Sequence, residues 1–457
     1  MNSTNVHWPE SLWAAVTPAG PELPELAGAQ EADVVVIGGG FTGLSTALHL
    51  RDAGLDVAVV EAMEPGWGAS GRNNGQVIPT LSRPDPEDII AKHGAAGERF
   101  VALLRDSASI LFDLTRRYNI PAEQEQTGWV QPVHSPGRIK IAERRVRQWS
   151  KFGAPVELLS RDQDRDMLGS DAWFGGFWNR SGGHINPLAL SRGLAGVVVE
   201  KGARIFARSP ATSIARRDGK WLVKTALGQI SGKALVVATN AYSDEFSKSL
   251  IPDLAREVVP VLSWQMATQP LSDNVRKTII PGRQAMSDTH GELYFARYDA
   301  RNRLVTGGAV IGPGNKAERI KARVTERLQR LWPQIGDVSF DLRLERLCRH
   351  DYGFSFARAP TRPRRLWLDR LQRPRRHAVD RAWWRIGEGG ARRCRTRPRT
   401  ALHGTDADSC AELVTQACAA DAARLPAARC PRDGVRGLAV QWPAGAEIAP
   451  PSRCDVQ

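Results

Sequence analysis

The residues from Asp33 to Gly43 read DVVVIGGGFTG and combine a short apolar run with closely spaced glycines. Gly38 permits a tight turn after the apolar run, and Gly40 lets a phosphate approach the backbone because it has no Cβ. Gly43 allows the following helix to pack closely on the strand. A helix N-terminus at this place offers free N–H groups and a favourable dipole to an anion. The motif therefore predicts a site for the pyrophosphate of a dinucleotide.

The elements that position this site follow one another along the chain. The apolar pattern predicts a strand over 34–37, a helix from about 41 to 53 and a second strand over 56–60. Glu61 ends the second strand, 18 residues after Gly43. An acid about 20 residues beyond the glycines accepts hydrogen bonds from ribose hydroxyls and would repel a 2′-phosphate, which argues against an NADP-type ligand.

Length and composition limit the class of protein. The chain has 457 residues, enough for two or three domain-sized units, and its hydrophobic content of 42% is ordinary for a soluble protein. No segment approaches the roughly 18 consecutive apolar residues of a membrane span. The start, Met1–Glu10, also lacks a basic region followed by an apolar stretch. We therefore expect a cytoplasmic protein without a membrane span.

The positive charge is concentrated in the last quarter of the chain. The net charge is +14, but from Leu344 onward there are 22 Arg, no Lys and 12 acidic residues, which gives this tail +10 of the total. All six cysteines of the chain lie in the tail: Cys348, Cys394, Cys410, Cys418, Cys430 and Cys454. Little helical or strand periodicity is present there, so we expect an irregular or disordered tail.

Three hypotheses compete for the tail. A metal module is disfavoured because the cysteines form no CxxC pair, and we predict no metal site. A polyanion-binding arm would usually mix Lys with Arg and avoid tryptophan, whereas Trp367, Trp383 and Trp384 lie among the arginines. The favoured hypothesis is a frameshift near residues 342–344. Synonymous codons for LERLCRHDYGF, read one base later, can give WNGYVGMTTDF, and LWLDRLQRPR can give YGWTGCNGRG.

Residues 8–343 resemble the D-amino-acid-oxidase-like family of FAD-dependent oxidoreductases, most closely its γ-glutamylputrescine oxidoreductase-like branch. The stretches that carry the resemblance are 33–61, GWGASGRNNGQ at 66–76, GHINP at 183–187, LVVATNAY at 235–242, and YFARY at 294–298 continuing to RLVTGG at 303–308. Asn74 stands where this family usually has glycine. The family's WxGxxxxTxDxxP-like and GxNGxG-like stretches are absent as the tail is written, although both strings recovered by the frame change resemble them.

The resemblance implies an enzyme that oxidises the C–N bond of an amine or amino acid, such as a polyamine conjugate, by hydride transfer to flavin N5 and hydrolysis of the imine. It implies FAD as cofactor, a small amine substrate, and oxygen or another electron acceptor. No cysteine occurs in residues 1–343, which excludes a thioether to flavin there, and we expect noncovalent FAD. The residues expected to contact FAD are Gly38, Gly40, Phe41, Thr42, Gly43, Glu61, Ala69, Ser70, Gly71, Arg72, Asn73, Gly75, Gln76, Ala238, Thr239 and Asn240.

Three further residues are candidates for catalysis or substrate binding. His184 could line the flavin or substrate side, or it could hydrogen-bond backbone where a helix begins after Pro187. Strand alternation places Arg297 on the face opposite Tyr298. Arg297 could bind a substrate carboxylate, although a solvated strand face is the alternative.

The predicted fold class is α/β, or α+β overall: a Rossmann-like FAD-binding domain interwoven with a mainly antiparallel substrate domain. The expected division is a lead-in at 1–30, FAD-domain segments at 31–86 and 183–245, substrate-domain segments at 87–182 and 246–343, and the tail at 344–457. Trp8 and Trp13 of the lead-in are expected to pack onto the fold.

The hypothesis of an NAD-dependent dehydrogenase would explain only the glycine motif at 33–43 and the acid that follows it, and not the stretches at 66–76 and 235–242. If the protein is the FAD-dependent enzyme, we expect no nucleic acid as a partner. Two alternatives stay open: an inactive frameshifted relative of the family and a protein that binds polyanions through its Arg-rich tail.

Overall fold

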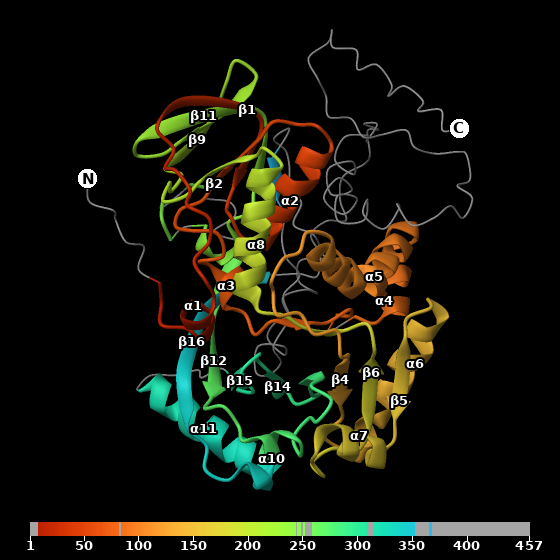
Figure 1. The fold of residues 1–457 in the computed structure, drawn as a ribbon. Helices are drawn as coiled ribbons and strands as arrows, with labels where there is room; N and C mark the ends of the chain where they lie inside the picture. The colour runs from red at the N-terminus through yellow and green to blue at the C-terminus, as the bar shows by residue number, and fades with distance from the viewer. Residues whose placement is uncertain are drawn as a thin grey trace, which may run out of the picture.

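The computed structural model describes residues 8–81, 84–243, 245–247, 250–251, 258–308, 315–351 and 365–367. Two large sheets lie at opposite ends of the molecule, one in the upper and one in the lower half of Figure 1. Segments from both halves of the sequence contribute to each end, so the chain passes between the two ends several times.

The first sheet has seven strands in the order β8-β2-β1-β11-β10-β9, with β17 also paired to β11. The pairs of β1 with β2 and β11, of β2 with β8, and of β11 with β17 are parallel, whereas β9 and β10 are antiparallel additions. The strands are β1 (Gly28–Ile37), β2 (Val57–Val60), β8 (Arg204–Phe206), β9 (Ser213–Arg217), β10 (Lys220–Lys224), β11 (Gly228–Val237) and β17 (Arg365–Trp367).

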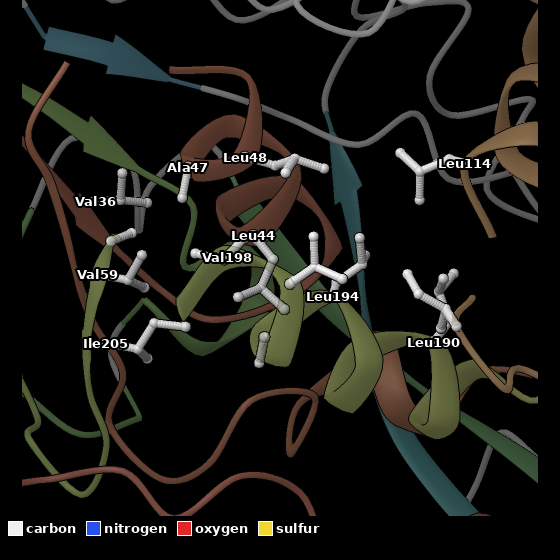
Figure 2. Packing of buried hydrophobic residues seen from close by; sticks show 14 of the residues in the cluster. Val36, Leu44, Ala47, Leu48, Val59, Leu114, Leu190, Leu194, Val198 and Ile205 are labelled. Carbon is white, nitrogen blue, oxygen red and sulfur yellow. The ribbon is translucent and has the colours of Figure 1, made fainter. Parts of the chain in front are cut away.

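Apolar side chains bury both faces of the parallel strands, as continuous runs such as VVVI require. On one face, Val36, Val59 and Ile205 meet helices α2 (Phe41–Asp52) and α8 (Pro187–Glu200), as Figure 2 shows. Val35 and Ile37 point to a separate buried cluster on the other face. The predicted helix after the glycines is thus present, ending at Asp52. Helices α4 (Pro86–His93) and α5 (Ala95–Arg117) follow in the sequence, and α5 adds Phe112 and Leu114 to the first cluster.

The second sheet has eight strands in the order β16-β12-β15-β14-β13-β4-β6-β5, and only the β13–β4 pair is parallel. Its strands are β4 (Trp129–Pro132), β5 (Val156–Leu159), β6 (Gly176–Asn179), β12 (Val258–Thr268), β13 (Ala285–Ser287), β14 (Phe295–Tyr298), β15 (Leu304–Gly308) and β16 (Phe340–Asp351). The helices beside it are α6 (Ile139–Lys151), α7 (Arg161–Leu168), α10 (Asp273–Arg276) and α11 (Lys316–Leu331), with single turns η1 (Pro136–Arg138) and η3 (Pro333–Ile335). Ile320, Val324 and Leu328 of α11 share a buried cluster with Tyr298 and Leu304.

Short elements join the two ends. They are α1 (Leu12–Val16), α3 (Ala69–Arg72), η2 (Asn240–Tyr242) and a two-stranded sheet of β3 (Gln76–Val77) and β7 (Gly183–His184). The Gln76 side chain reaches the second sheet, where Nε2 donates to the Met286 carbonyl at 2.8 Å. The cofactor loop expected at 66–76 therefore lies between the sheets.

These observations confirm the predicted fold class, with a parallel-rich sheet and a mainly antiparallel second sheet. Strand β16 crosses the boundary predicted at 343/344 and pairs with β12 from Phe340 through to Asp351. The predicted domain boundaries stay a prediction. Beyond Asp351, only 365–367 is described, and the rest of the tail lies outside the described residues. Within the described part of the chain, no helix is both long and apolar enough to cross a membrane.

Candidate cofactor site

The carboxyl ends of β1, β2 and β11 meet at one edge of the first sheet. Ala238 N donates to the Ile37 carbonyl at 2.8 Å, and Gly38 N donates to the Val60 carbonyl at 2.9 Å. The strand residues before this edge are buried, whereas Gly38, Gly40, Glu61 and Ala238 keep part of their surface accessible. This edge is where open α/β sheets bind ligands.

The glycines are required by close backbone contacts. Gly38 has a φ of +108°, and a Cβ there would lie 2.6 Å from the Ala238 carbonyl oxygen. A Cβ on Gly43 would lie 1.9 Å from the Gly38 carbonyl oxygen, so α2 packs on the turn as predicted. Gly40 is the N-cap of α2 and makes no side-chain capping bond. A helix start of this kind, opened by Phe41 and Thr42, can accept an anion.

Glu61 lies beside the same turn. Its carboxylate accepts hydrogen bonds from Gly39 N and, at 2.9 Å, from Met63 N. Burial raises the pKa of the Glu61 carboxyl, and the backbone donors oppose that shift. Since each carboxylate oxygen carries two acceptor positions, ribose hydroxyls can bind in addition to these amides.

Helix α3 is attached to the start of α2. Ser70 Oγ accepts from Phe41 N at 3.0 Å, and a Cβ on Gly40 would lie only 2.8 Å from Ser70 Oγ. Ala69 and Gly71 are buried, and a Cβ on Gly71 would lie 2.2 Å from the Gly66 carbonyl oxygen. The loop therefore places Ser70 next to the predicted phosphate position.

Arg72 and η2 form the other wall of this region. Arg72 Nη2 donates to Tyr242 Oη at 2.7 Å, and its guanidinium carbon lies 4.8 Å from the centre of the Trp67 ring. Thr239 Oγ1 lies 2.7 Å from Ser243 Oγ, and Asn240 adopts a positive φ of 52° in the turn after β11. The sequence motifs at 66–76 and 235–242 are thus brought together.

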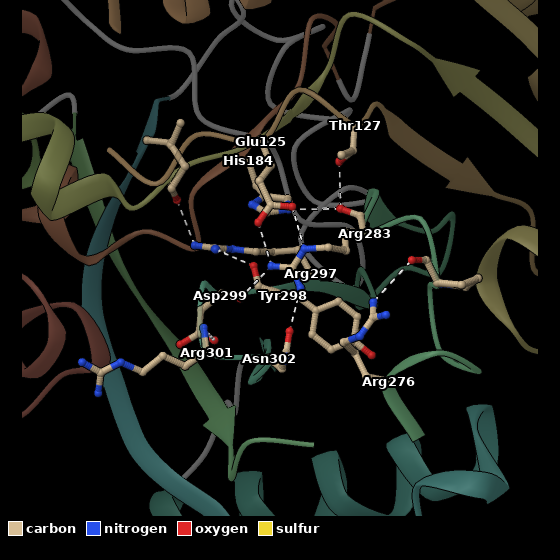
Figure 3. A network of polar contacts seen from close by, with 12 residues as sticks. Glu125, Thr127, His184, Arg276, Arg283, Arg297, Tyr298, Asp299, Arg301 and Asn302 are labelled. Atoms are coloured by element: carbon tan, nitrogen blue, oxygen red, sulfur yellow. Dashed lines mark hydrogen bonds and ion pairs between the residues drawn. The ribbon is translucent and has the colours of Figure 1, made fainter. Parts of the chain in front are cut away.

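A polar network connects His184 of β7 with Glu125 and Arg283, which precede β4 and β13 (Figure 3). His184 is 1% exposed, and its Nε2 donates to the Arg283 carbonyl at 3.1 Å. Burial holds the pKa of His184 well below its usual value, so the imidazole is neutral. Of the two roles predicted for His184, the hydrogen bond to a backbone carbonyl is present. A catalytic role for His184 stays a prediction.

Arg297 and Tyr298 point to opposite faces of β14, as alternation predicts. Tyr298 Oη donates to the Ile279 carbonyl at 2.8 Å in the core under α11, and burial raises the pKa of its phenol. Arg297 is 1% exposed and donates to the carbonyls of Asn74, Ile185 and Tyr298. The alternative of a solvated strand face is wrong for Arg297, because its side chain is buried, and carboxylate binding by Arg297 stays a prediction.

Several participants carry no local sequence signal. Glu125 and Arg283 pair at 2.7 Å although they are far apart in the chain. Trp13 donates from Nε1 to the Asn73 carbonyl at 2.8 Å. The lead-in tryptophans were expected to pack on the fold, but nothing in the sequence indicated these partners.

The residues present fit an FAD molecule. Its pyrophosphate would meet the start of α2, where Gly40 leaves room that a Cβ would fill and Ser70 Oγ bonds Phe41 N, and its ribose would meet Glu61. Among the described residues no group of three or more His, Cys, Asp or Glu side chains could hold a metal ion.

Comparison with known proteins agrees with this reading. Residues 33–368 match the family model described as "FAD dependent oxidoreductase". The chain is 33% identical over 313 residues to γ-glutamylputrescine oxidoreductase of Escherichia coli (strain K12), a match that covers 68% of this chain and 72% of that protein. It is 27% identical over 350 residues to human mitochondrial dimethylglycine dehydrogenase, covering 72% of this chain and 36% of that protein.

Solved structures share the fold. Glycine oxidase from Geobacillus kaustophilus superposes with a TM-score of 0.61 at 17% identity, covering 74% of this chain and 88% of that one. L-proline dehydrogenase from P. horikoshii gives a TM-score of 0.59 at 19% identity, covering 71% and 82%. At these identities the similarity concerns the arrangement of elements.

Proposed function

Because this chain belongs to the family of FAD-dependent oxidoreductases, we propose that it binds FAD noncovalently and oxidises the C–N bond of a small amine or amino acid. The supporting observation is the partly accessible edge where Gly38, Gly40, Glu61 and Ala238 lie beside the start of α2. The glycines, the start of α2 and Glu61 lie where one elongated dinucleotide could contact all of them, and α3 and η2 lie beside this position.

Each part of the chain has a physical task. The start of α2 neutralises the pyrophosphate through N–H groups and the helix dipole, while Glu61 fixes a ribose. Ser70 ties α3 to the same helix start. When bound, the flavin supplies a hydride acceptor at N5, and an amine that loses hydride from the carbon beside its nitrogen becomes an imine that water hydrolyses.

The proposed substrate class follows the relative with the highest identity given above. γ-Glutamylputrescine, or a related polyamine conjugate or amino acid, is the first compound to test. The relatives also include a dimethylglycine dehydrogenase, so N-methylated glycines are the second class. Oxygen or another acceptor would reoxidise the flavin.

The test begins with the visible absorption spectrum of the purified chain before and after denaturation and filtration. A flavin band that passes into the filtrate would support noncovalent FAD. Candidate amines are then added without oxygen, and bleaching of the band near its maximum identifies a substrate. Retention of flavin on the denatured chain would contradict noncovalent binding, and a flavin that no amine bleaches would contradict amine oxidation.

A further inference from the structure

The turn from Asn73 to Gly75, which follows α3, is closely enclosed. Asn73 Oδ1 accepts from Gly75 N at 2.8 Å, and Asn73 Nδ2 donates to the Ser70 carbonyl at 2.6 Å. Gly75 has a φ of +77°, and a Cβ there would lie 2.1 Å from the Ile185 carbonyl oxygen. The turn is thus joined to Ser70, which in turn bonds the start of α2 through Phe41 N.

The lead-in segment holds one side of this turn. Trp13 is fully buried, and its indole Nε1 donates to the Asn73 carbonyl at 2.8 Å. Further along the same segment, Thr17 Oγ1 bonds the Asn186 side chain at the start of α8. The segment is therefore fixed at several places, one of them on the cofactor loop.

The second sheet holds the other side. Arg297 Nε donates to the Asn74 carbonyl at 2.7 Å, and Nη2 donates to the Ile185 carbonyl at 3.0 Å. Its guanidinium carbon lies 4.5 Å from the centre of the Trp13 ring, in cation–π contact. Trp13 and Arg297 thus touch each other and bond the carbonyls of adjacent residues of one turn.

Because Arg297 is buried, its positive charge must be stabilised by neighbouring groups of the protein. Burial lowers the pKa of Arg297 to about 10, so the side chain is still positively charged at neutral pH. The buried charge is stabilised by the backbone carbonyls that accept hydrogen bonds from Arg297 and by the nearby carboxylates of Asp299, Glu123 and Glu125. The carbonyls of Asn74 and Ile185 must therefore keep their orientation for Arg297 to stay paired.

We infer that Trp13 and Arg297 are positioning residues that clamp the Asn73–Gly75 turn and thereby hold α3 in the geometry that FAD binding requires. The part concerning FAD rests on the proposed function. Trp13 lies before residue 33, where the match to the family begins, so this role is assigned outside the matched region.

The test uses the full chain with two conservative substitutions, Trp13→Phe and Arg297→Lys. Trp13→Phe keeps an aromatic ring and removes the N–H donor. Arg297→Lys keeps the positive charge and removes the planar guanidinium group that donates to several carbonyls at once. Trp149→Phe is the matched control. Like Trp13, Trp149 of α6 is fully buried, but its Nε1 has no hydrogen-bond partner within the described residues. Arg145→Lys, also in α6 and 4% exposed, is the control for arginine.

Two readouts are measured: amide hydrogen exchange at Gly75 and Ile185, and the FAD dissociation constant by quenching of flavin fluorescence. We expect Trp13→Phe and Arg297→Lys to speed exchange at both amides and to weaken FAD binding about tenfold, the change expected when a buried carbonyl loses its donor. The controls should leave both readouts within twofold of the unchanged chain.

The outcomes separate the two proposals. Unchanged exchange at Gly75 and Ile185 in both variants would overturn the clamp, whatever the flavin does. Faster exchange with an unchanged FAD dissociation constant would overturn its role in cofactor binding. If the unsubstituted chain binds no FAD, the proposed function fails for this chain, and exchange alone then decides whether the clamp exists.

Discussion

Glu125 and Arg283 form a bidentate ion pair in which Oε2 to Nε and Oε1 to Nη2 are both 2.7 Å. The pair joins the chain before β4 to the chain before β13, and Arg283 also donates to Asn302 Oδ1 and the Asp299 carbonyl. His184 donates to the Arg283 carbonyl, so the pair also fixes β7 (Figure 3). The ion pair therefore joins segments that are distant in the sequence, and it acts together with the backbone bridge between Glu125 and His184.

Glu125→Gln should therefore destabilise the fold. The substitution leaves the Arg283 guanidinium in a partly buried place without its counter-charge, and we expect the free energy of unfolding to fall by about 1–3 kcal/mol. Urea denaturation measures this change. Asp113→Asn is the control, because its pair with Arg116 is exposed and should contribute less than about 1 kcal/mol. Equal losses in both variants would contradict a special role for Glu125.

Asp164 should make stability fall as pH rises. Burial raises the pKa of its carboxyl from 3.8 to about 7, so between these values the folded chain holds a proton that the unfolded chain has released. The stability that Asp164 contributes to the folded chain is fully present below about pH 4 and is lost as the pH rises through 7. The loss in the free energy of unfolding has an upper limit on the order of 4 kcal/mol. Denaturation midpoints at several pH values measure it.

Asp164→Asn should flatten this pH dependence and raise stability at pH 8 relative to the unchanged chain. Asp162→Asn in the same helix is the control, because the Asp162 side chain is exposed. A slope between pH 5 and 8 that survives Asp164→Asn would show that another group causes it.

Gly40→Ala should weaken FAD binding at least tenfold, because the new Cβ would lie 2.8 Å from Ser70 Oγ at the start of α2. Gly196→Ala in α8 is the control, since a Cβ there meets nothing within 4 Å and alanine favours a helix. Flavin fluorescence titration measures both variants. Tight FAD binding by Gly40→Ala would place the pyrophosphate elsewhere.

Restoring the downstream reading frame near residues 342–344 should increase the flavin bound per chain. The reason is that the strings recovered by the frame change resemble stretches that complete the flavin domain of the family, and these stretches are absent from the tail as written. Absorbance ratios of the two purified chains measure the change. The control moves the frame by two bases instead of one, which does not produce the family-like strings. Equal flavin content in all three chains would count against the frameshift hypothesis.

The cofactor edge could be predicted because its information is local. Val34 to Gly43 specify strand, turn and helix within one short stretch, and the Gly43 contact was expected for the same reason. Asn186 and Pro187 likewise specify the start of α8 through capping and a fixed φ.

Long-range partners could not be predicted. Alternation indicated which face of β14 Arg297 occupies, but not that the opposing residues would be backbone carbonyls and Trp13. A strand pattern predicts a face, whereas the identity of the group facing it depends on how distant segments pack. The Glu125–Arg283 pair is unpredictable for the same reason, because neither residue lies in a motif.

The pairing of β1 with β11 has a consequence for biosynthesis. Gly28 to Ile37 align with Gly228 to Val237, so the central strand of the first sheet waits for a partner that is translated about two hundred residues later. Until then, one edge of β1 has unpaired backbone groups, which are prone to association with other chains. The nascent chain can therefore pair this edge of β1 only after Val237 has been synthesised.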